Sequence, residues 1–427
     1  MLCTAMDEEF SLNDPTHLLE SASEFAHHPV LQNDAATKDF LDRFPLPVII
    51  SALQTKADVP GLENALVECL EKVFKTKYGA SLIPQYMGRV RVLSLIVKLF
   101  SISNSVASVV YNSNLLSLLE VEIRNSNDTL VTLSALELLY ELTEIQHGTE
   151  FLSRTTLLLL HSIISNSSME SILRSRAMMI SGRLLSKENI YMVVDEPSAK
   201  GVISAINVRI GLLNSLDTDE CLSALEALGQ IGSSIQGAVL LLSSFPPAAR
   251  HIVHAAFDWQ GRGKQLAALH ALGNVAGEKR PEDSVMLNGD AEENLRLLIY
   301  EVASQSSKLT PSGLFLSVLQ QAEEFRLAGY RVITGLVARS WCLMEICSKQ
   351  EIINMVTDPA TETTKIGMEA RYNCCKAIHR AFMSSKLVSD PALHGIAVKL
   401  QDGVQRGPYL ARKHTEAAPV VMTAEIF

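Results

Sequence analysis

The chain has 427 residues, of which 47% are hydrophobic and only 6% aromatic, and its formal net charge is −10. This acidic balance argues against a dominant phosphate-neutralising surface, and therefore against nucleic acid as the main ligand. The length predicts two or three globular units, unless repeats form one long array.

The N-terminal residues, MLCTAMDEEF, lack the basic and apolar segments of a signal peptide. The richest apolar run, 92–110, is interrupted by Lys98 and Asn104 and falls short of the roughly 18 apolar residues that a membrane-spanning helix needs. The seven cysteines show no paired spacing. We therefore expect no membrane partner and a location in the cytoplasm, with the nucleus as a second location.

Internal repetition is the strongest signal in the sequence. The segments LSALEALGQIG from Leu222 and LAALHALGNVA from Leu266 match in pattern and start 44 residues apart. A third copy, LSALELLYEL, starts at Leu133, 89 residues before Leu222, which is about two periods of the roughly 40–47 residues typical of HEAT and armadillo repeats. The copy between them should begin near Ala177, in AMMISGRLL.

The spacing within each copy predicts a buried helix. Apolar residues recur every three positions from Leu222 to Ile231, and the alanines between them widen the apolar face. Small residues let neighbouring helices approach, so this is the expected inner helix of each repeat. Gly229 and Gly273 occupy equivalent positions; because glycine costs about 1 kcal/mol in a helix interior, they imply close packing or a helix end.

Two further copies, LAGYRVITGLV and YNCCKAIHRAF, start at Leu327 and Tyr372, 45 residues apart, but 61 residues separate Leu266 from Leu327. The extra length falls on the polar stretch 277–294, which predicts a surface loop. We expect residues 1–410 to form a single helical-repeat solenoid. Residues 411–427 lack a sustained apolar period and are expected to be a disordered tail.

Helix starts are predicted where a capping side chain precedes a proline. Four sites have this pattern: Asp14-Pro15, Thr310-Pro311, Asp358-Pro359 and Asp390-Pro391. No convincing segment alternates with period two, so no sheet is expected. The predicted fold is an all-α solenoid of the HEAT/armadillo kind.

Motifs for catalysis or cofactor binding are nearly absent. Gly261-Arg-Gly-Lys264 resembles a phosphate loop, but Asp258 stands where that motif requires glycine and no strand precedes it, so we expect a turn before a helix. His251 and His254 lie three residues apart without a flanking carboxylate and are expected to be ordinary helix residues.

The cysteines likewise suggest no site. Cys374 and Cys375 are adjacent, whereas zinc sites need duplicated pairs of the CxxC type. Cys375 falls on the apolar stripe, which predicts a place in the core. We expect no enzyme activity, no cofactor and no metal.

Alignment of the repeats reveals a column of polar residues beside the apolar stripe, continued four residues later on the same helix face. We call it the ladder. Its members, which are our candidate partner-binding residues, are Glu137, Glu141, Glu226, Gln230, His270, Asn274, Arg331, Lys376 and Arg380, with Gly335 at the remaining place. The column runs from acidic to basic, which suits a protein partner of complementary polarity if the inner helices line a concave surface. The alternative is that the ladder is only the solvated side of each helix.

Several segments also resemble a known family. They are Gln146-His147-Gly148 with Phe151-Leu152, FRLAGYRVITGLVARSW at 325–341, EARYNCCKAI at 369–378, and Gly407-Pro408-Tyr409. These segments resemble the family of 26S proteasome non-ATPase regulatory subunit 5. The resemblance implies an assembly chaperone that binds ATPase subunits of the 19S regulatory-particle base, with associated non-ATPase subunits, and that is absent from the finished particle. Such a chaperone needs no active site. Separately, the acidic residues Asp7 to Glu9 suggest a capped end of the array, so we expect a monomer outside its complexes.

The sequence departs from that family near 87–91, where the stripe of Leu62, Ala65 and Cys69 reaches Leu93 after only 31 residues. We interpret this as helices missing from the family pattern, as in an alternatively spliced form. The alternative function is an armadillo or HEAT adaptor for other proteins. Peptide-binding adaptors usually present regularly spaced Asn and Trp, whereas Trp259 and Trp341 lie outside the ladder positions.

Overall fold

The structure is a computed structural model, and it is all-helical in the residues that it describes. These residues are 15–28, 33–45, 48–49, 52, 59–78, 90, 93–94, 96–112, 116–125, 128–145, 148, 154–213, 218–281 and 284–409. They divide between two compact units, 1–99 and 100–427, which we describe separately.

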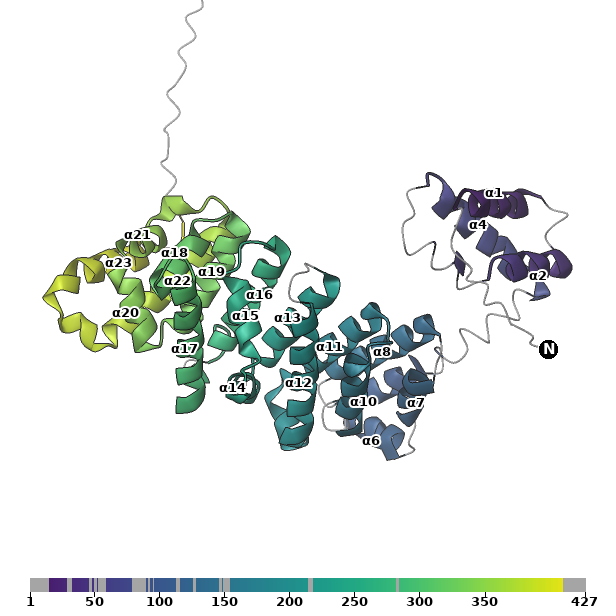
Figure 1. The fold of residues 1–427 in the computed structure, drawn as a ribbon, viewed down its shortest axis with the longest axis horizontal. Coiled ribbons are helices and arrows are strands. Elements are labelled where there is room, and N and C mark those ends of the chain that lie inside the picture. The colour runs from purple at the N-terminus through teal and green to yellow at the C-terminus, as the bar shows by residue number, and fades with distance from the viewer. Residues whose placement is uncertain are drawn as a thin grey trace, which may run out of the picture. The chain divides into compact units, whose positions relative to one another are not determined.

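The first unit contains three described helices, α1 (Pro15–His27), α2 (Asp34–Arg43) and α4 (Leu62–Lys75). Helix α1 packs against α4 (Figure 1). Phe25 and Phe40 stack with ring centroids 5.0 Å apart, and both belong to a buried cluster that includes Leu66 and Val73. This unit therefore has its own hydrophobic core.

The second unit is a stack of helices (Figure 1). Its elements are α6 (Asn104–Asn112), α7 (Ser117–Asn125), α8 (Thr129–Glu144), α10 (Arg154–Ser165), α11 (Ser171–Leu185), η2 (Glu188–Met192), α12 (Glu196–Leu212), α13 (Asp219–Ile231), α14 (Ile235–Ser243), α15 (Ala249–Ala256), α16 (Arg262–Ala276), α17 (Gly289–Gln305), α18 (Pro311–Leu319), α19 (Glu323–Leu336), α20 (Ser340–Ser348), α21 (Gln350–Thr357), η4 (Pro359–Thr361), α22 (Lys365–Met383), η5 (Lys386–Ser389), η6 (Pro391–Leu393) and α23 (His394–Arg406).

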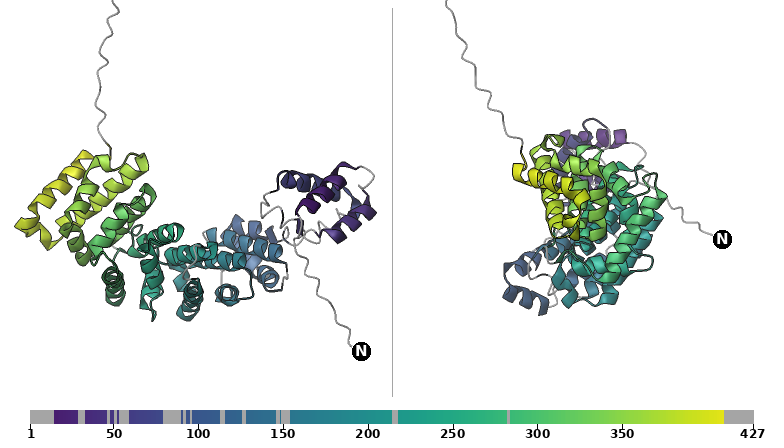
Figure 2. Two further views of the ribbon diagram at one scale, coloured as in Figure 1. Left: turned by 45° about the horizontal axis from the view of Figure 1, so that its top comes forward. Right: turned by 90° about the vertical axis from the view of Figure 1, so that its left-hand side faces the viewer.

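These helices form three-helix repeats: η2–α12–α13, α14–α15–α16, α17–α18–α19 and α20–α21–α22. The third helices of these repeats, preceded by α8 and α11, pack directly on one another in the order α8, α11, α13, α16, α19, α22, which we call the inner row. Colour changes steadily along this unit in Figure 2, as expected when each repeat contacts mainly its neighbours. The unit is an armadillo/HEAT-like α-solenoid, which confirms the predicted fold class.

Each predicted copy of the repeated helix is a member of the inner row. The register of α11 differs by two residues from the prediction: Gly182 abuts Ala227 as Gly229 abuts Ala271, so Ala177 corresponds to Ala224 and not to Leu222. The cause is a spacing of 47 residues, and not 44 or 45, between α11 and α13.

Close packing holds at Gly229 but not at Gly273. A Cβ atom added to Gly229 would lie 2.7 Å from the Cα of Ala271, so α13 and α16 touch through backbone at this point. A Cβ atom on Gly273 would meet its nearest neighbour, the Cβ of Arg331, at 3.6 Å, which is ordinary contact. Gly229 therefore fits the first alternative, close packing, and Gly273 fits the second, a helix end: its carbonyl oxygen, in the last turn of α16, accepts a hydrogen bond from Glu278 N at 3.1 Å.

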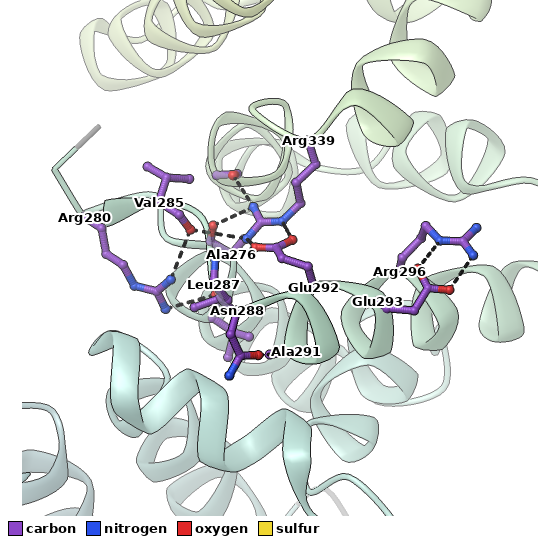
Figure 3. A network of polar contacts seen from close by, with 12 residues as sticks. Ala276, Arg280, Val285, Leu287, Asn288, Ala291, Glu292, Glu293, Arg296 and Arg339 are labelled. Atoms are coloured by element: carbon purple, nitrogen blue, oxygen red, sulfur yellow. Dashed lines mark hydrogen bonds and ion pairs between the residues drawn. The ribbon is translucent and has the colours of Figure 1, made fainter. Parts of the chain in front are cut away.

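The predicted surface loop is shorter and more firmly held than expected. Helix α16 ends at Gly277 with φ +91°, and α17 begins at Gly289, where the Asn288 side chain accepts a hydrogen bond from Ala291 N at 2.9 Å. Residues 289–294 are thus helical. Between these helices Arg280 donates from Nε to Ser233 O at 3.1 Å, and Figure 3 shows it reaching Val285.

Three of the four capping predictions fall on described residues. Thr310 accepts from Gly313 N at 3.1 Å and starts α18 as predicted. Asp358 and Asp390 do cap, but each starts a short 3-10 helix, with α22 and α23 beginning a few residues later. Asp14 lies outside the described residues, although α1 begins at Pro15.

Three other predictions lie wholly or mostly outside the described residues: the short repeat at 87–91, the segment around 146–152 and the tail 411–427. One continuous array over residues 1–410 stays a prediction. In the described part of the chain no single helix is long and apolar enough to cross a membrane, and only α13 with α14, bent by 119°, passes that test as a pair.

Candidate partner-binding surface

The inner row brings the ladder residues onto one surface, because each helix presents the same position beside its neighbour. Glu137 and Glu141 lie on α8, Glu226 and Gln230 on α13, His270 and Asn274 on α16, Arg331 on α19, and Lys376 and Arg380 on α22. Contacts of Arg331 with His270 and Asn274 show that the ladder residues of α16 and α19 share a face. Their role in binding a partner stays a prediction.

Two arginines of α11 pair with glutamates of α8, one of which, Glu137, is a ladder residue. Arg176 forms an ion pair with Glu137, and its guanidinium lies 4.1 Å from the ring centroid of Tyr140. Arg183 forms an ion pair with Glu144, and the hydrogen bond that it donates lowers the pKa of Glu144. In the corrected register Arg183 is the ladder residue of α11, so the shifted alignment hid it.

The middle of the ladder is held together internally. Arg331 donates from Nη2 to Asn274 Oδ1 at 3.2 Å, pairs with Glu278 at 3.1 Å, and lies with Nη1 2.7 Å from His270 Nδ1. Burial, followed by the charge of Arg331, lowers the pKa of His270. On α13, Gln230 donates to Glu226 at 3.2 Å. Arg331 therefore links α16 to α19, and its guanidinium already has contacts within the chain.

The basic end is more open. Lys376 and Arg380 are exposed on α22, one helical turn apart. Gly335, the corresponding place on α19, is buried, and a Cβ atom there would lie 2.8 Å from the Cβ of Ala276. Among the ladder residues, exposed charge is thus concentrated at α8, at Glu226 and at α22.

Two further kinds of site can be judged in the described residues, metal sites and reactive cysteines. No group of three His, Cys, Asp or Glu among them could hold a metal. Cys375 is fully buried, as predicted, and burial raises its pKa to about 11, which keeps the thiol protonated and unreactive at neutral pH. Trp341 lies on α20 and Trp259 between α15 and α16, so neither belongs to the inner row.

Comparison with known proteins gives one family. The family described as "Proteasome non-ATPase 26S subunit" matches residues 63–425, a range that contains the whole inner row. No curated protein matches the chain.

Similar solved structures include an engineered protein (TM-score 0.46, 14% identity, 92% of this chain and 95% of that chain covered) and a designed armadillo repeat protein in complex with the peptide (KR)4 (0.44, 14%, 60% and 97%). The structure of She4p is a third (0.44, 12%, 90% and 53%). At such scores, the stacked helices themselves carry the fold assignment.

Proposed function

Because the chain belongs to the proteasome non-ATPase 26S subunit family, we propose that it is an assembly chaperone that binds ATPase subunits of the 19S regulatory-particle base. The observation that carries this proposal is the family match over residues 63–425. Associated non-ATPase subunits would join the same complex. The chain would act as a monomer, in the cytoplasm and secondarily in the nucleus.

The stacked inner row supports a binding role. A solenoid offers side chains from many helices on one continuous surface, and large surfaces of this kind suit folded protein partners. The ladder carries carboxylates at α8 and cations at α22, so a partner with the opposite gradient would be oriented along the row. This function needs no catalytic step.

The mechanism would be holding. A partner surface covered by the inner row cannot dock elsewhere at the same time, so the chaperone would delay premature contacts and leave when a competing partner binds the same surface more tightly. Its specificity would come from ladder charges that pair with opposite charges on the partner. Because such exposed charges are screened by salt, the complex should weaken as salt is added.

The test is co-purification of the tagged full-length chain from its own cell extract at low and moderate salt. Recovery of base ATPases without the core protease is the expected result. The substitution Lys376→Glu should then reduce recovery several-fold, since it reverses an exposed ladder charge. Lys200→Glu is the matched control, because the exposed Lys200 lies on α12, which is not a helix of the inner row, and pairs with Glu196 one turn earlier on the same helix.

Each outcome separates one part of the proposal. Recovery of other proteins without any proteasome subunit at either salt would contradict the chaperone function. Recovery of ATPases that Lys376→Glu and Lys200→Glu reduce equally would place the contact away from the ladder.

A further inference from the structure

Apolar side chains run beside the ladder on four successive helices of the inner row, and we call them the apolar strip. Each lies one helical turn before the ladder residue of its helix, and hence on the same face. The members are Leu222 on α13, Leu266 on α16, Leu327 on α19 and Tyr372 on α22. Because these helices pack directly on one another in this order, the strip follows the same surface as the ladder.

Partial exposure distinguishes the strip from the other apolar positions of these helices. All four strip residues are half-buried. In contrast, apolar residues on the core side of α13, α16 and α19 are at most 1% exposed, and they include Leu225, Leu228, Leu269, Leu272, Ile333 and Leu336. A single half-exposed leucine is ordinary, but a repeated one bordered by polar residues is typical of a surface that binds another protein.

The ladder residues beside the strip place opposite charges near its two ends. Glu226 is exposed on α13, and Lys376 is exposed on α22. Between them Arg331 pairs with Glu278 at 3.1 Å and contacts His270, so its charge is partly compensated within the chain. A segment that lies along the strip would therefore be favoured by a cation beside Glu226 and an anion beside Lys376.

The spacing of the strip favours a helical occupant. Packed helices lie about 8–10 Å apart, so successive strip residues are separated by about this distance. Seven residues of an α-helix rise about 10.5 Å and return to the same face. An extended chain instead places side chains on one face about 6.6 or 13 Å apart. A helix with an apolar residue in every seven would thus meet one member of the strip after another.

We propose that the apolar strip binds an amphipathic helix of the partner protein, laid across α13, α16, α19 and α22. The helix presents its apolar face to the strip and its charged residues to Glu226 and Lys376, as amphipathic helices do in apolar grooves. Three steps of about 8–10 Å require about 16–20 helical residues. This inference rests on the proposed partner-binding role of the inner row and defines the kind of segment that it binds.

Fluorescence anisotropy with labelled 21-residue peptides, each about three heptads long, tests this site on the full chain. The first peptide carries two leucines on one face of every heptad, with Lys in the first heptad and Glu in the last. The second has the same composition, but its leucines are spread round the helix. The third has two central prolines, which break the helix. We expect the first peptide to bind at least about 10-fold more tightly than either of the others.

Substitutions locate the binding. Leu266→Gln and Leu327→Gln should each weaken the first peptide at least about 5-fold, because each removes apolar contact area in the middle of the strip. Glu226→Lys, at an exposed position, should weaken it without any loss of core packing. Leu297→Gln is the matched control, since Leu297 is 50% exposed on α17, which is not a helix of the inner row. Circular dichroism would show that all variants keep the helical fold.

Equal binding of the first two peptides would overturn the proposal, as would a loss of affinity in Leu297→Gln as large as in the strip variants. Equal or tighter binding of the proline peptide would assign the strip to an extended segment and overturn the helical occupant.

The strip and the proposed function can fail separately. Base ATPases that co-purify equally with the unmodified chain and with Leu266→Gln would support the chaperone function and overturn the strip. Selective binding of the first peptide, without any recovery of ATPases, would support the strip and contradict the chaperone function.

Discussion

At the residue scale, Gly229 and Gly273 occupy the same repeat position but meet different surroundings. We expect Gly229→Ala to destabilise the chain by about 1–3 kcal/mol, because the new methyl group would overlap Ala271 and force α13 and α16 apart. Gly273→Ala should stabilise it by about 0.5–1 kcal/mol, since the methyl group fits and alanine favours the helix. Urea unfolding followed by circular dichroism measures both. Equal effects of the two substitutions on the free energy of unfolding would contradict the different distances from these glycines to the neighbouring helix.

Glu220 makes a second residue-scale prediction, on pH. Burial opposes its ionisation, but hydrogen bonds from Arg174 and Arg209 outweigh that effect and lower its pKa. A lowered pKa means that its stabilisation is complete above the unfolded value of about 4.3 and is lost as pH falls through the folded value. Glu220→Gln should therefore cost about 3 kcal/mol at pH 6 and distinctly less at pH 3.

Urea titrations of both proteins at the two pH values measure this difference. Asp219→Asn is a suitable control, because it removes the neighbouring carboxylate, for which the structure describes no ion pair. A cost of Glu220→Gln that stays constant with pH would show that its loss acts through packing and not through charge.

At the element scale, Arg339 joins three helices where their ends meet (Figure 3). It donates to the carbonyl oxygens of Ala276 at 3.0 Å and Gly335 at 2.9 Å, which end α16 and α19, and it pairs with Glu292 of α17. Its side chain is 1% exposed. Arg339→Gln should cost about 3–5 kcal/mol, because it leaves Glu292 without its counter-charge and two helix ends without a donor.

Helix α17, which carries Glu292, also offers a control for this prediction. Arg296 pairs with Glu293 three residues away on α17, in a partly exposed position that Figure 3 shows beside the first pair. Arg296→Gln should hardly move the unfolding midpoint, since such pairs contribute little. Thermal unfolding of both variants decides the point. Similar shifts would mean that the buried pair contributes no more than the exposed one.

Helices of the inner row could be predicted because their signal is local. The stripe from Leu222 to Ile231 carries its own period, and a repeat of 44 residues needs no knowledge of the fold. The start of α17 was missed because Asp290 and Glu292 look like loop residues in the sequence. They are the acidic first turn of a helix, and the partner of Glu292, Arg339, lies 47 residues away.

For the candidate surface too, contacts between residues far apart in the sequence could not be predicted. The ladder positions followed from the alignment, but Arg176, which pairs with Glu137, lies on the helix whose register was two residues off. Whether a charged residue forms an ion pair depends on its distance from charged groups on the neighbouring helix, and a single sequence does not give that distance. At α22, the last helix of the inner row, the charges of Lys376 and Arg380 are exposed as the alignment suggested.

At the scale of the whole molecule, stability should be local. In the described residues each inner helix packs mainly on its two neighbours, and the first unit has a core of its own around Phe25, Phe40 and Leu66. In such an array a lost contact weakens the adjacent repeats and fades with distance. A destabilising change in one repeat should therefore leave remote repeats and the first unit protected.

Hydrogen–deuterium exchange of Gly229→Ala tests this expectation. Exchange should accelerate in α13 and α16, which the added methyl group separates, and to a smaller degree in α11 and α19. It should stay unchanged in α1 and α4, whose buried residues make up a separate cluster. Gly273→Ala provides the reference with the opposite sign. Faster exchange throughout the chain, including α1 and α4, would mean that the two units unfold as one cooperative body and that nearest-neighbour packing does not describe this protein.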